Sequence, residues 1–125
     1  MIEREKVRIL REHVTGVKRL SYSGHFGGHL VSVGHEIYVN VWAPESKISE
    51  VLMGRLKGHT KPVIDAKFLN NRPFVVTVDE ANFIRIWDIR TLVCLQLLKS
   101  KSKAIPQGLA IIDNSSFWVF GRRFT

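Results

Sequence analysis

The chain has 125 residues, of which 45% are hydrophobic and 24% charged, and it carries a formal net charge of +8. This composition is typical of a globular domain and excludes a disordered tail, and no apolar run reaches the roughly 18 residues that a membrane span needs. The charged residues 1–6 are unlike a signal peptide. Cys94 is the single cysteine, which excludes an internal disulfide and favours a reducing compartment, so we expect a cytoplasmic protein without a membrane partner.

Short apolar runs rich in β-branched and aromatic residues follow one another along the chain, separated by turn residues such as Asn, Asp, Gly and Pro. Runs of this kind predict β-strands joined by tight turns. In chain order, the predicted strands are residues 6–10, 17–22, 30–34, 38–42, 48–53, 63–68, 74–78, 83–87, 92–98, 107–112 and 117–120. Four such strands in about forty residues form one antiparallel meander, which needs neighbours on both faces to bury its apolar side chains.

Two stretches of the chain, residues 10–53 and 56–98, repeat each other in register. The second opens on a Gly-His pair at His59 and closes its third strand on a Trp-Asp pair at Trp87. The first has a His and a Trp at the matching positions, at a period of about 45 residues. This pattern resembles the WD40 family, in which each repeat forms one blade of a β-propeller.

The resemblance implies an all-β fold of WD40 propeller blades, each a four-stranded antiparallel meander. We predict an outer strand of a preceding blade at residues 6–10, full blades at 11–53 and 54–98, and the first half of a further blade at 104–121. Two full blades plus parts of two others form an incomplete propeller, because a closed ring needs at least about four blades. We therefore expect the remaining blades to come from a longer chain or from other copies.

WD40 repeats contain a buried, hydrogen-bonded tetrad of His, Asp, Ser or Thr, and Trp, which holds the blade together. The matching positions are His13, Ser32, Glu36 and Trp42 in the first blade, and His59, Thr77 and Trp87 in the second. Ala81 stands at the position where the tetrad aspartate of the second blade is expected. Asp79 is a candidate substitute, but alternation puts it beside Ala81 on the same face, which predicts a weaker or rerouted network around His59. All these residues are predicted to be structural.

Other chemistry is poorly supported by the sequence. His25, His29 and His35 raise the alternative of a zinc site, but no cysteine accompanies them and acidic neighbours are few. Ser21 and Ser23 lie near His25, yet no complete set of nucleophile, base and acid can be assembled. We predict a protein that is not an enzyme and has no metal and no cofactor.

The resemblance implies a rigid platform, one face of which holds peptides or partner domains. The loops of that face are predicted at residues 11–16, 34–37, 55–62 and 79–82. The candidate partner-binding residues on them are His35, Lys57, Lys61 and Glu80. The sequence therefore favours a non-enzymatic scaffold for protein–protein interaction.

Two alternatives remain for the partner. Residues 87–90 match the WDxR box of substrate receptors in cullin-RING ubiquitin ligases, where Arg90 would dock the adaptor, although Arg90 could instead pair with Asp88 in a turn. Nucleic-acid binding depends on the net charge alone, and the one dense basic run, residues 99–103, is more typical of a solvated loop. Nucleic acid is therefore the less favoured partner.

The repeats are also similar to those of EF-hand-associated ciliary WD40 proteins. This likeness lies in residues 30–44 and 55–90, and it implies a cytoskeletal or ciliary association. No calcium-binding loop of the EF-hand type is present in the sequence.

Overall fold

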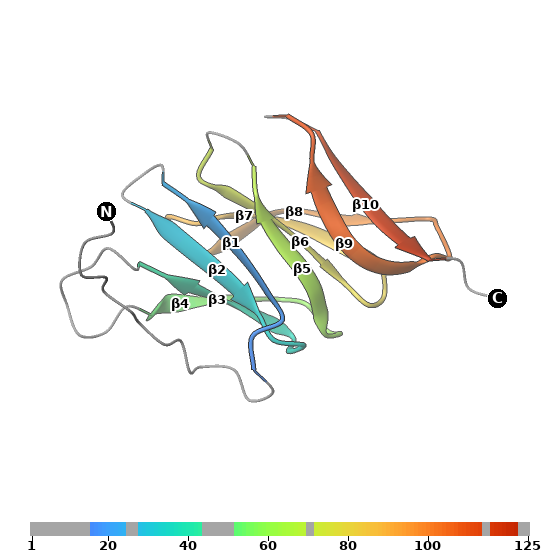
Figure 1. Ribbon diagram of the computed structural model, residues 1–125, viewed down its shortest axis with the longest axis horizontal. Helices are drawn as coiled ribbons and strands as arrows, with labels where there is room; N and C mark the ends of the chain where they lie inside the picture. Colours follow the sequence, from blue (N-terminus) through green and yellow to red (C-terminus); the bar gives the residue numbers. More distant parts are fainter. Residues whose placement is uncertain (1–15, 25–27, 44–51, 70–71, 114–115, 123–125) are drawn as a thin grey trace, which may run out of the picture.

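The computed structural model describes residues 16–24, 28–43, 52–69, 72–113 and 116–122, and these residues contain ten β-strands and no helix. The strands are β1 (Arg19–Ser23), β2 (His29–Val33), β3 (Tyr38–Trp42), β4 (Leu52–Lys57), β5 (Val63–Phe68), β6 (Phe74–Asp79), β7 (Phe83–Asp88), β8 (Val93–Lys99), β9 (Ile105–Ile111) and β10 (Phe117–Arg122). They form two four-stranded antiparallel sheets, β1–β4 and β5–β8, and a two-stranded sheet, β9–β10 (Figure 1). The prediction of an all-β fold built from four-stranded meanders is confirmed.

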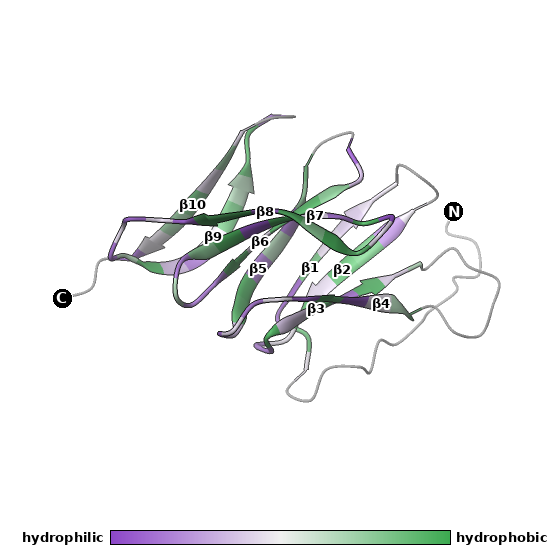
Figure 2. Cartoon of the chain, turned by 180° about the vertical axis from the view of Figure 1, so that it is seen from behind, coloured by the Kyte–Doolittle hydropathy of each residue, from purple (hydrophilic) through white to green (hydrophobic). Residues whose placement is uncertain are grey.

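The middle sheet separates two apolar clusters, because successive side chains of a strand point to opposite faces. Val75 and Trp87 face the first sheet and are almost completely buried against it. Val76 and Val78 point the other way and pack with Leu109 of β9. Green apolar stretches accordingly run along the strands of all three sheets in Figure 2. The core therefore lies between neighbouring sheets, and each sheet depends on the next.

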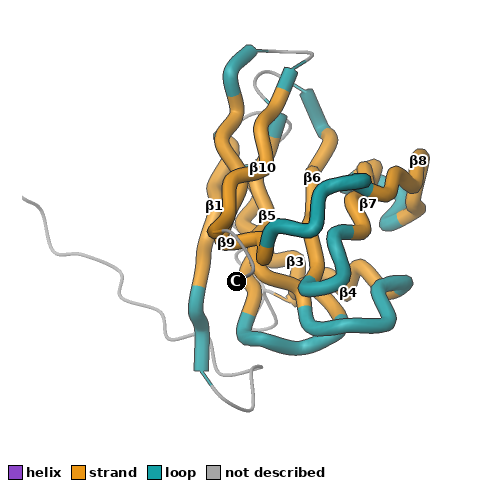
Figure 3. The backbone as a smooth tube through the Cα atoms, turned by 90° about the vertical axis from the view of Figure 1, so that its right-hand side faces the viewer, coloured by secondary structure: helices purple, strands orange, loops and turns teal. Residues whose placement is uncertain are grey.

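The first strands of the three sheets, β1, β5 and β9, lie side by side, and the outer strands β7 and β8 lie on the opposite side of the molecule (Figure 3). Side-chain oxygens join these inner strands. The Phe68 N–H donates to the Ser21 hydroxyl at 3.3 Å, and the Leu109 N–H donates to the buried Asp65 carboxylate at 2.9 Å. The first two sheets thus each supply an acceptor for a backbone donor of the next inner strand.

Some strand limits differ from the predicted ones. β4 extends to Lys57, past the predicted end at residue 53, because it pairs with β3 over the whole length of that strand, from Trp42 to Tyr38. β10 continues to Arg122 through a bulge at Gly121. A Cβ at Gly121 would lie 2.1 Å from the Ile105 carbonyl oxygen, so only glycine fits there. The predicted strand at residues 6–10 lies outside the described residues.

The outward faces at the two ends of the sheet stack carry exposed apolar side chains. Tyr22 on β1 is 53% exposed, and Trp118 and Phe120 on β10 are 69% and 48% exposed. Away from these ends, Leu95 and Leu97 on β8, the outer strand of the middle sheet, are also about half exposed. These positions alternate along their strands, so each end presents a row of apolar side chains with no sheet packed on it among the described residues.

Candidate interaction face

Four connections between strands form one continuous surface, which we call the loop face: residues 34–37, 58–62, 80–82 and 100–104. Three backbone hydrogen bonds join them in order. The Val63 N–H donates to the Glu36 carbonyl at 2.8 Å, the Glu80 N–H to the Pro62 carbonyl at 3.1 Å, and the Ser100 N–H to the Asn82 carbonyl at 3.0 Å. The position of each loop is therefore fixed by its neighbours.

Four of the five predicted partner-binding residues lie on or beside this face. His35 Nε2 lies 3.4 Å from Glu80 Oε1, with side chains 55% and 42% exposed, so the structure brings together two candidates from neighbouring sheets. His35 has a φ of 69°, a left-handed turn conformation. Lys61 is exposed in the β4–β5 connection, and Lys57 is exposed at the end of β4, where a loop was predicted.

Arg90, the fifth candidate, lies at the opposite end of the sheets, in the turn between β7 and β8. The Ile89 N–H beside it donates to the Pro73 carbonyl in the β5–β6 connection. Arg90 Nε and Nη2 donate to the two carboxylate oxygens of Asp88, at 3.0 Å and 2.8 Å. This pair lowers the pKa of Asp88 and raises that of Arg90. The guanidinium of the WDxR box is thus engaged within its own turn.

Beneath the loop face, a buried chain of hydrogen bonds connects β6, β7 and the β4–β5 connection. Trp87 Nε1 donates to Thr77 Oγ1 at 2.9 Å, and Thr77 Oγ1 lies 2.5 Å from His59 Nε2. His59 Nδ1 lies 2.7 Å from Asp79 Oδ2. The consistent proton assignment has Thr77 donating to Nε2 and Nδ1–H donating to Asp79, which requires a neutral imidazole.

Burial is the main reason that His59 is neutral. Desolvation lowers its pKa below the ordinary 6.5, and the charge of Arg85 acts in the same direction. The hydrogen bond and the charge of Asp79 raise the pKa but do not overcome the effect of burial. The network is therefore suited to holding the sheet together near neutral pH.

The Asp79 carboxylate also stabilises the turn between β6 and β7. Its Oδ1 accepts the backbone N–H groups of Ala81 and Phe83, at 2.8 Å and 3.1 Å, and so closes the turn between β6 and β7. A weaker or rerouted network around His59 was expected because Ala81 occupies the usual aspartate position. In the structure the network runs through Asp79, because the imidazole bridges Thr77 and Asp79, which alternation places on the same face of β6.

The first sheet has a corresponding pair, with Trp42 Nε1 donating to Ser32 Oγ at 2.8 Å in a buried position. Glu36 accepts a hydrogen bond from the Tyr38 hydroxyl. His13, the remaining member of the predicted tetrad, lies outside the described residues, as does His25. Within the ranges that the structure describes, no group of three His, Cys, Asp or Glu side chains could hold a metal ion.

Two important residues were missed by reasoning from the sequence. Asn82 has a φ of 65°, and its side-chain amide donates to the carbonyls of Ser102 and Ala104, at 3.3 Å and 2.8 Å. An Asn at the end of a predicted tight turn was the available signal. Asp65 is the one acidic residue in the predicted strand at residues 63–68 and has apolar neighbours on both sides, which signals a buried acceptor.

Comparison with known proteins identifies the repeat. A family model described as "WD domain, G-beta repeat" matches residues 50–88. Cilia- and flagella-associated protein 337 B of Tetrahymena thermophila is 29% identical over 71% of this chain and 7% of its own length. Nuclear distribution protein nudF of Emericella nidulans is 28% identical over 93% of this chain and 26% of its own length. The chain thus spans about a quarter or less of these relatives.

A solved structure shares the fold. One chain in the Crystal Structure of Mitotic Checkpoint Complex superposes with a TM-score of 0.69 at 22% identity, covering 85% of this chain and 31% of that one. No helix in the described ranges has the length and apolar character that a bilayer crossing would need.

Proposed function

We propose that this chain, which belongs to the WD40-repeat family, is part of a non-enzymatic platform that binds other proteins through its loop face. The observation that carries this proposal is the row of three backbone hydrogen bonds joining the four connections, together with the contact between His35 and Glu80. A surface whose loops are fixed by one another loses little conformational entropy when a partner binds. Such a surface suits recognition by several loops at once.

The buried polar groups argue against catalysis. Thr77, His59 and Asp79 form the kind of hydroxyl–imidazole–carboxylate chain that activates nucleophiles in hydrolases. Here Thr77 is 0% exposed and its oxygen already accepts the indole N–H of Trp87, so a substrate has no access to it. We infer that these groups stabilise the blade and do not react.

We further propose that the sheets β1–β4 and β5–β8 are the two blades predicted at residues 11–53 and 54–98, with the first extended to Lys57 by β4, and that β9–β10 are the half blade predicted at 104–121. The missing blades would come from a longer chain or from other copies. The relatives are named for cilia, flagella and nuclear distribution. Their names support a cytoplasmic location with cytoskeletal association, in which the platform would hold a protein of that machinery.

The ubiquitin-ligase alternative is not carried forward, because the guanidinium of Arg90 is held by Asp88 at the end away from the loop face. The protein-binding proposal instead makes the loop face the part of the molecule that selects partners. It is therefore tested by changes confined to that face.

The test compares two variants with unchanged net charge. One exchanges charges on the loop face, Lys61→Glu with Glu80→Lys, and the other moves a charge at the opposite end, Arg72→Gln with Thr91→Lys. All four side chains are exposed, so both variants should fold. Proteins captured from cell extract are compared with those captured by the unchanged chain, using quantitative mass spectrometry. We expect partners to be lost only with the loop-face variant, and the proposal fails when both variants retain the same set.

A further inference from the structure

We propose that residues 99–104, which are the last residue of β8 and the connection from it to β9, form a docking site for an acidic, extended segment of a protein partner. This segment, which we call the lysine strap, contains Lys99, Lys101 and Lys103. The inference rests on the proposed function, because the strap is the last of the four connections of the loop face. The inference specifies the chemical character of the partner segment, which the proposed function leaves open.

The strap is an anchored element and not a loose loop. Asn82 binds it at three points: its backbone carbonyl accepts the Ser100 N–H at 3.0 Å, and its side-chain amide donates to the carbonyls of Ser102 and Ala104. Asn is one of the few residues that adopt the required φ of 65° at low cost. The turn between β6 and β7 therefore fixes the path of the strap.

Serines and lysines alternate along the strap and have different roles. The Ser100 hydroxyl accepts the Ser102 N–H at 3.2 Å, and the Ser102 hydroxyl accepts the Ala104 N–H at 3.0 Å. The lysines between them are exposed. Lys99 lies with its ammonium 4.7 Å from the centre of the Phe83 ring, which orders its side chain.

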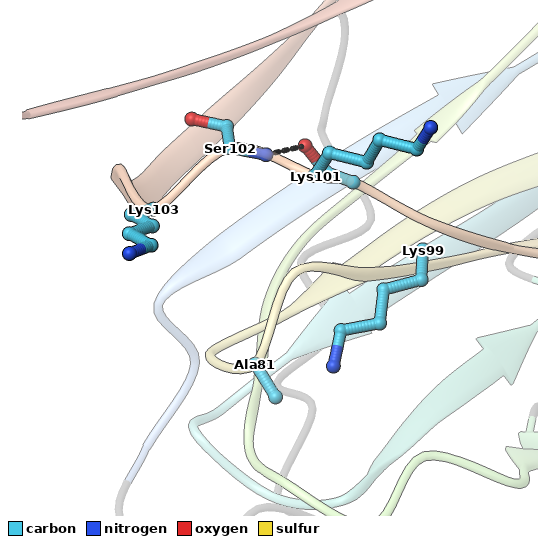
Figure 4. Close-up of a pocket in the computed structure, with 6 residues that line it drawn as sticks. Ala81, Lys99, Lys101, Ser102 and Lys103 are labelled. Carbon is cyan, nitrogen blue, oxygen red and sulfur yellow. Dashed lines mark hydrogen bonds between the residues drawn. The ribbon is translucent and has the colours of Figure 1, made fainter.

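These residues surround an open depression beside Ala81, and the Lys101 side chain leaves the backbone in another direction than those of Lys99 and Lys103 (Figure 4). Ammonium groups spread apart in this way are not arranged around one phosphate. They can instead meet carboxylates spaced along an extended peptide, which would run across the depression. The geometry therefore favours a segment with several separate charges.

The surroundings leave this positive charge largely uncompensated. Lys57 and Lys61 add two further exposed ammonium groups on or beside the loop face. Asp79 is buried against His59, so Glu36 and Glu80 are the loop-face carboxylates that oppose the five lysines. The field over the strap is thus positive, in keeping with the net charge of +8, and it would steer an acidic partner toward it.

A protein segment fits better than nucleic acid. The described residues of the loop face include no Arg, Phe, Tyr or Trp, whereas single-stranded nucleic acids are usually held by stacking on aromatic rings. Phe83, at the edge of the face, is covered by Lys99. The strap therefore offers charge without a stacking platform.

The test measures fluorescence anisotropy of a labelled peptide of alternating Glu and Gly added to the full chain at low salt. The strap variant is Lys101→Gln with Lys103→Gln, and the matched control is Lys67→Gln with Arg72→Gln, which removes the same charge away from the strap. We expect the strap variant to weaken binding about tenfold and the control to stay within about twofold. Equal weakening by both variants would mean that only net charge matters and would overturn the proposal.

Asn82→Gly provides a second variant, because glycine keeps the positive φ and all the lysines but removes the amide. We expect it to weaken peptide binding about threefold, since the strap must then be ordered on binding. Unchanged affinity would contradict an anchored strap. An oligonucleotide of the same charge that binds more tightly than the peptide would also overturn the proposal in favour of nucleic acid.

The outcome is separable from that of the proposed function. Absence of peptide binding, combined with partner loss in the Lys61→Glu and Glu80→Lys variant, would reject an acidic partner and leave the platform standing. Absence of both effects would reject both.

Discussion

At the scale of single residues, the Asp79 side chain holds both His59 and the turn between β6 and β7. One of its carboxylate oxygens binds His59 and the other accepts two backbone N–H groups of the turn. The residue is 1% exposed, so water cannot replace these bonds. Removing the carboxylate would leave several buried polar groups without a hydrogen-bond partner, and each such group lowers the free energy of unfolding.

We therefore expect Asp79→Ala to lower the free energy of unfolding by about 3 kcal/mol. Glu80→Ala is the matched control, because the neighbouring carboxylate is exposed and should matter by less than about 0.5 kcal/mol. Urea unfolding of the three proteins measures both values. Equal stability of the Asp79→Ala variant and the unchanged chain would contradict the network.

His59 makes a second prediction at this scale. Its pKa in the folded state lies below the ordinary 6.5, so the unfolded chain binds a proton more readily. The stabilisation is fully present above pH 6.5 and is lost as the pH falls from there through the folded pKa. We expect the urea midpoint to decrease between pH about 7.5 and about 5.5.

Two variants assign that decrease to the right histidine. His59→Asn should flatten the pH dependence, and His35→Asn should retain it, because Asn tolerates the left-handed conformation at residue 35. A midpoint that rises on acidification would show that the charged imidazole is favoured in the fold, against the neutral assignment.

The sequence could anticipate part of this network only. His59, Thr77 and Trp87 stand at motif positions, and their side chains meet in the structure. Asp79 was named as a candidate substitute for the aspartate that Ala81 replaces, although strand alternation puts it beside Ala81 on the same face and not in the same place. That same alternation puts Thr77 and Asp79 on one face, where a single imidazole with nitrogens on both sides reaches both. Alignment to a motif compares positions along the chain, and it does not show which side chains one imidazole can contact in space.

At the scale of the strand, the contacts between inner strands decide how the sheets hold together. Asp65 is completely buried in β5, and its two oxygens accept the N–H groups of Ala66 and Leu109. Ser21 in β1 makes the equivalent contact with Phe68, but at 3.3 Å and in a half-buried position. The two sites make the same kind of contact but differ in burial and bond length, so comparing them shows how much burial of the acceptor contributes to stability.

We expect Asp65→Ala to lower the free energy of unfolding by about 2 kcal/mol, since the Leu109 N–H is left buried without an acceptor. Ser21→Ala should cost less than about 1 kcal/mol, because water can reach the freed donor. Hydrogen exchange at Leu109 should also accelerate in the first variant only. Equal effects of the two substitutions would show that burial of the acceptor is not what matters.

Strand limits were less predictable than strand existence. The apolar runs located every one of the ten described strands, but the predicted run at residues 48–53 gave only the start of β4. Residues 54–57 include Gly54 and two basic residues, a composition unlike a strand. Pairing along the whole of β3 overrides this local preference.

At the scale of the whole molecule, the two ends of the sheet stack are the unsatisfied part of the fold. Trp118 and Phe120 on β10 and Leu20 and Tyr22 on β1 form apolar rows on opposite ends, each about half exposed or more. β10 and β1 are also edge strands among the described residues, so their backbone groups can pair with a further strand. Both features favour contact between the end of one molecule and another.

We therefore expect this chain, prepared alone, to associate as its concentration rises, because burying such rows is favourable at roughly 25 cal/mol per Å². Light scattering across a concentration series should give a mass that climbs above 14.3 kDa. Trp118→Glu with Phe120→Glu places charge in the row on β10 and should return the mass toward that of the monomer. Leu95→Glu, on the exposed face of β8, tests whether the outer strand takes part. A mass of one chain at every concentration would mean that these rows do not drive association, and the missing blades would then have to be sought in a longer chain.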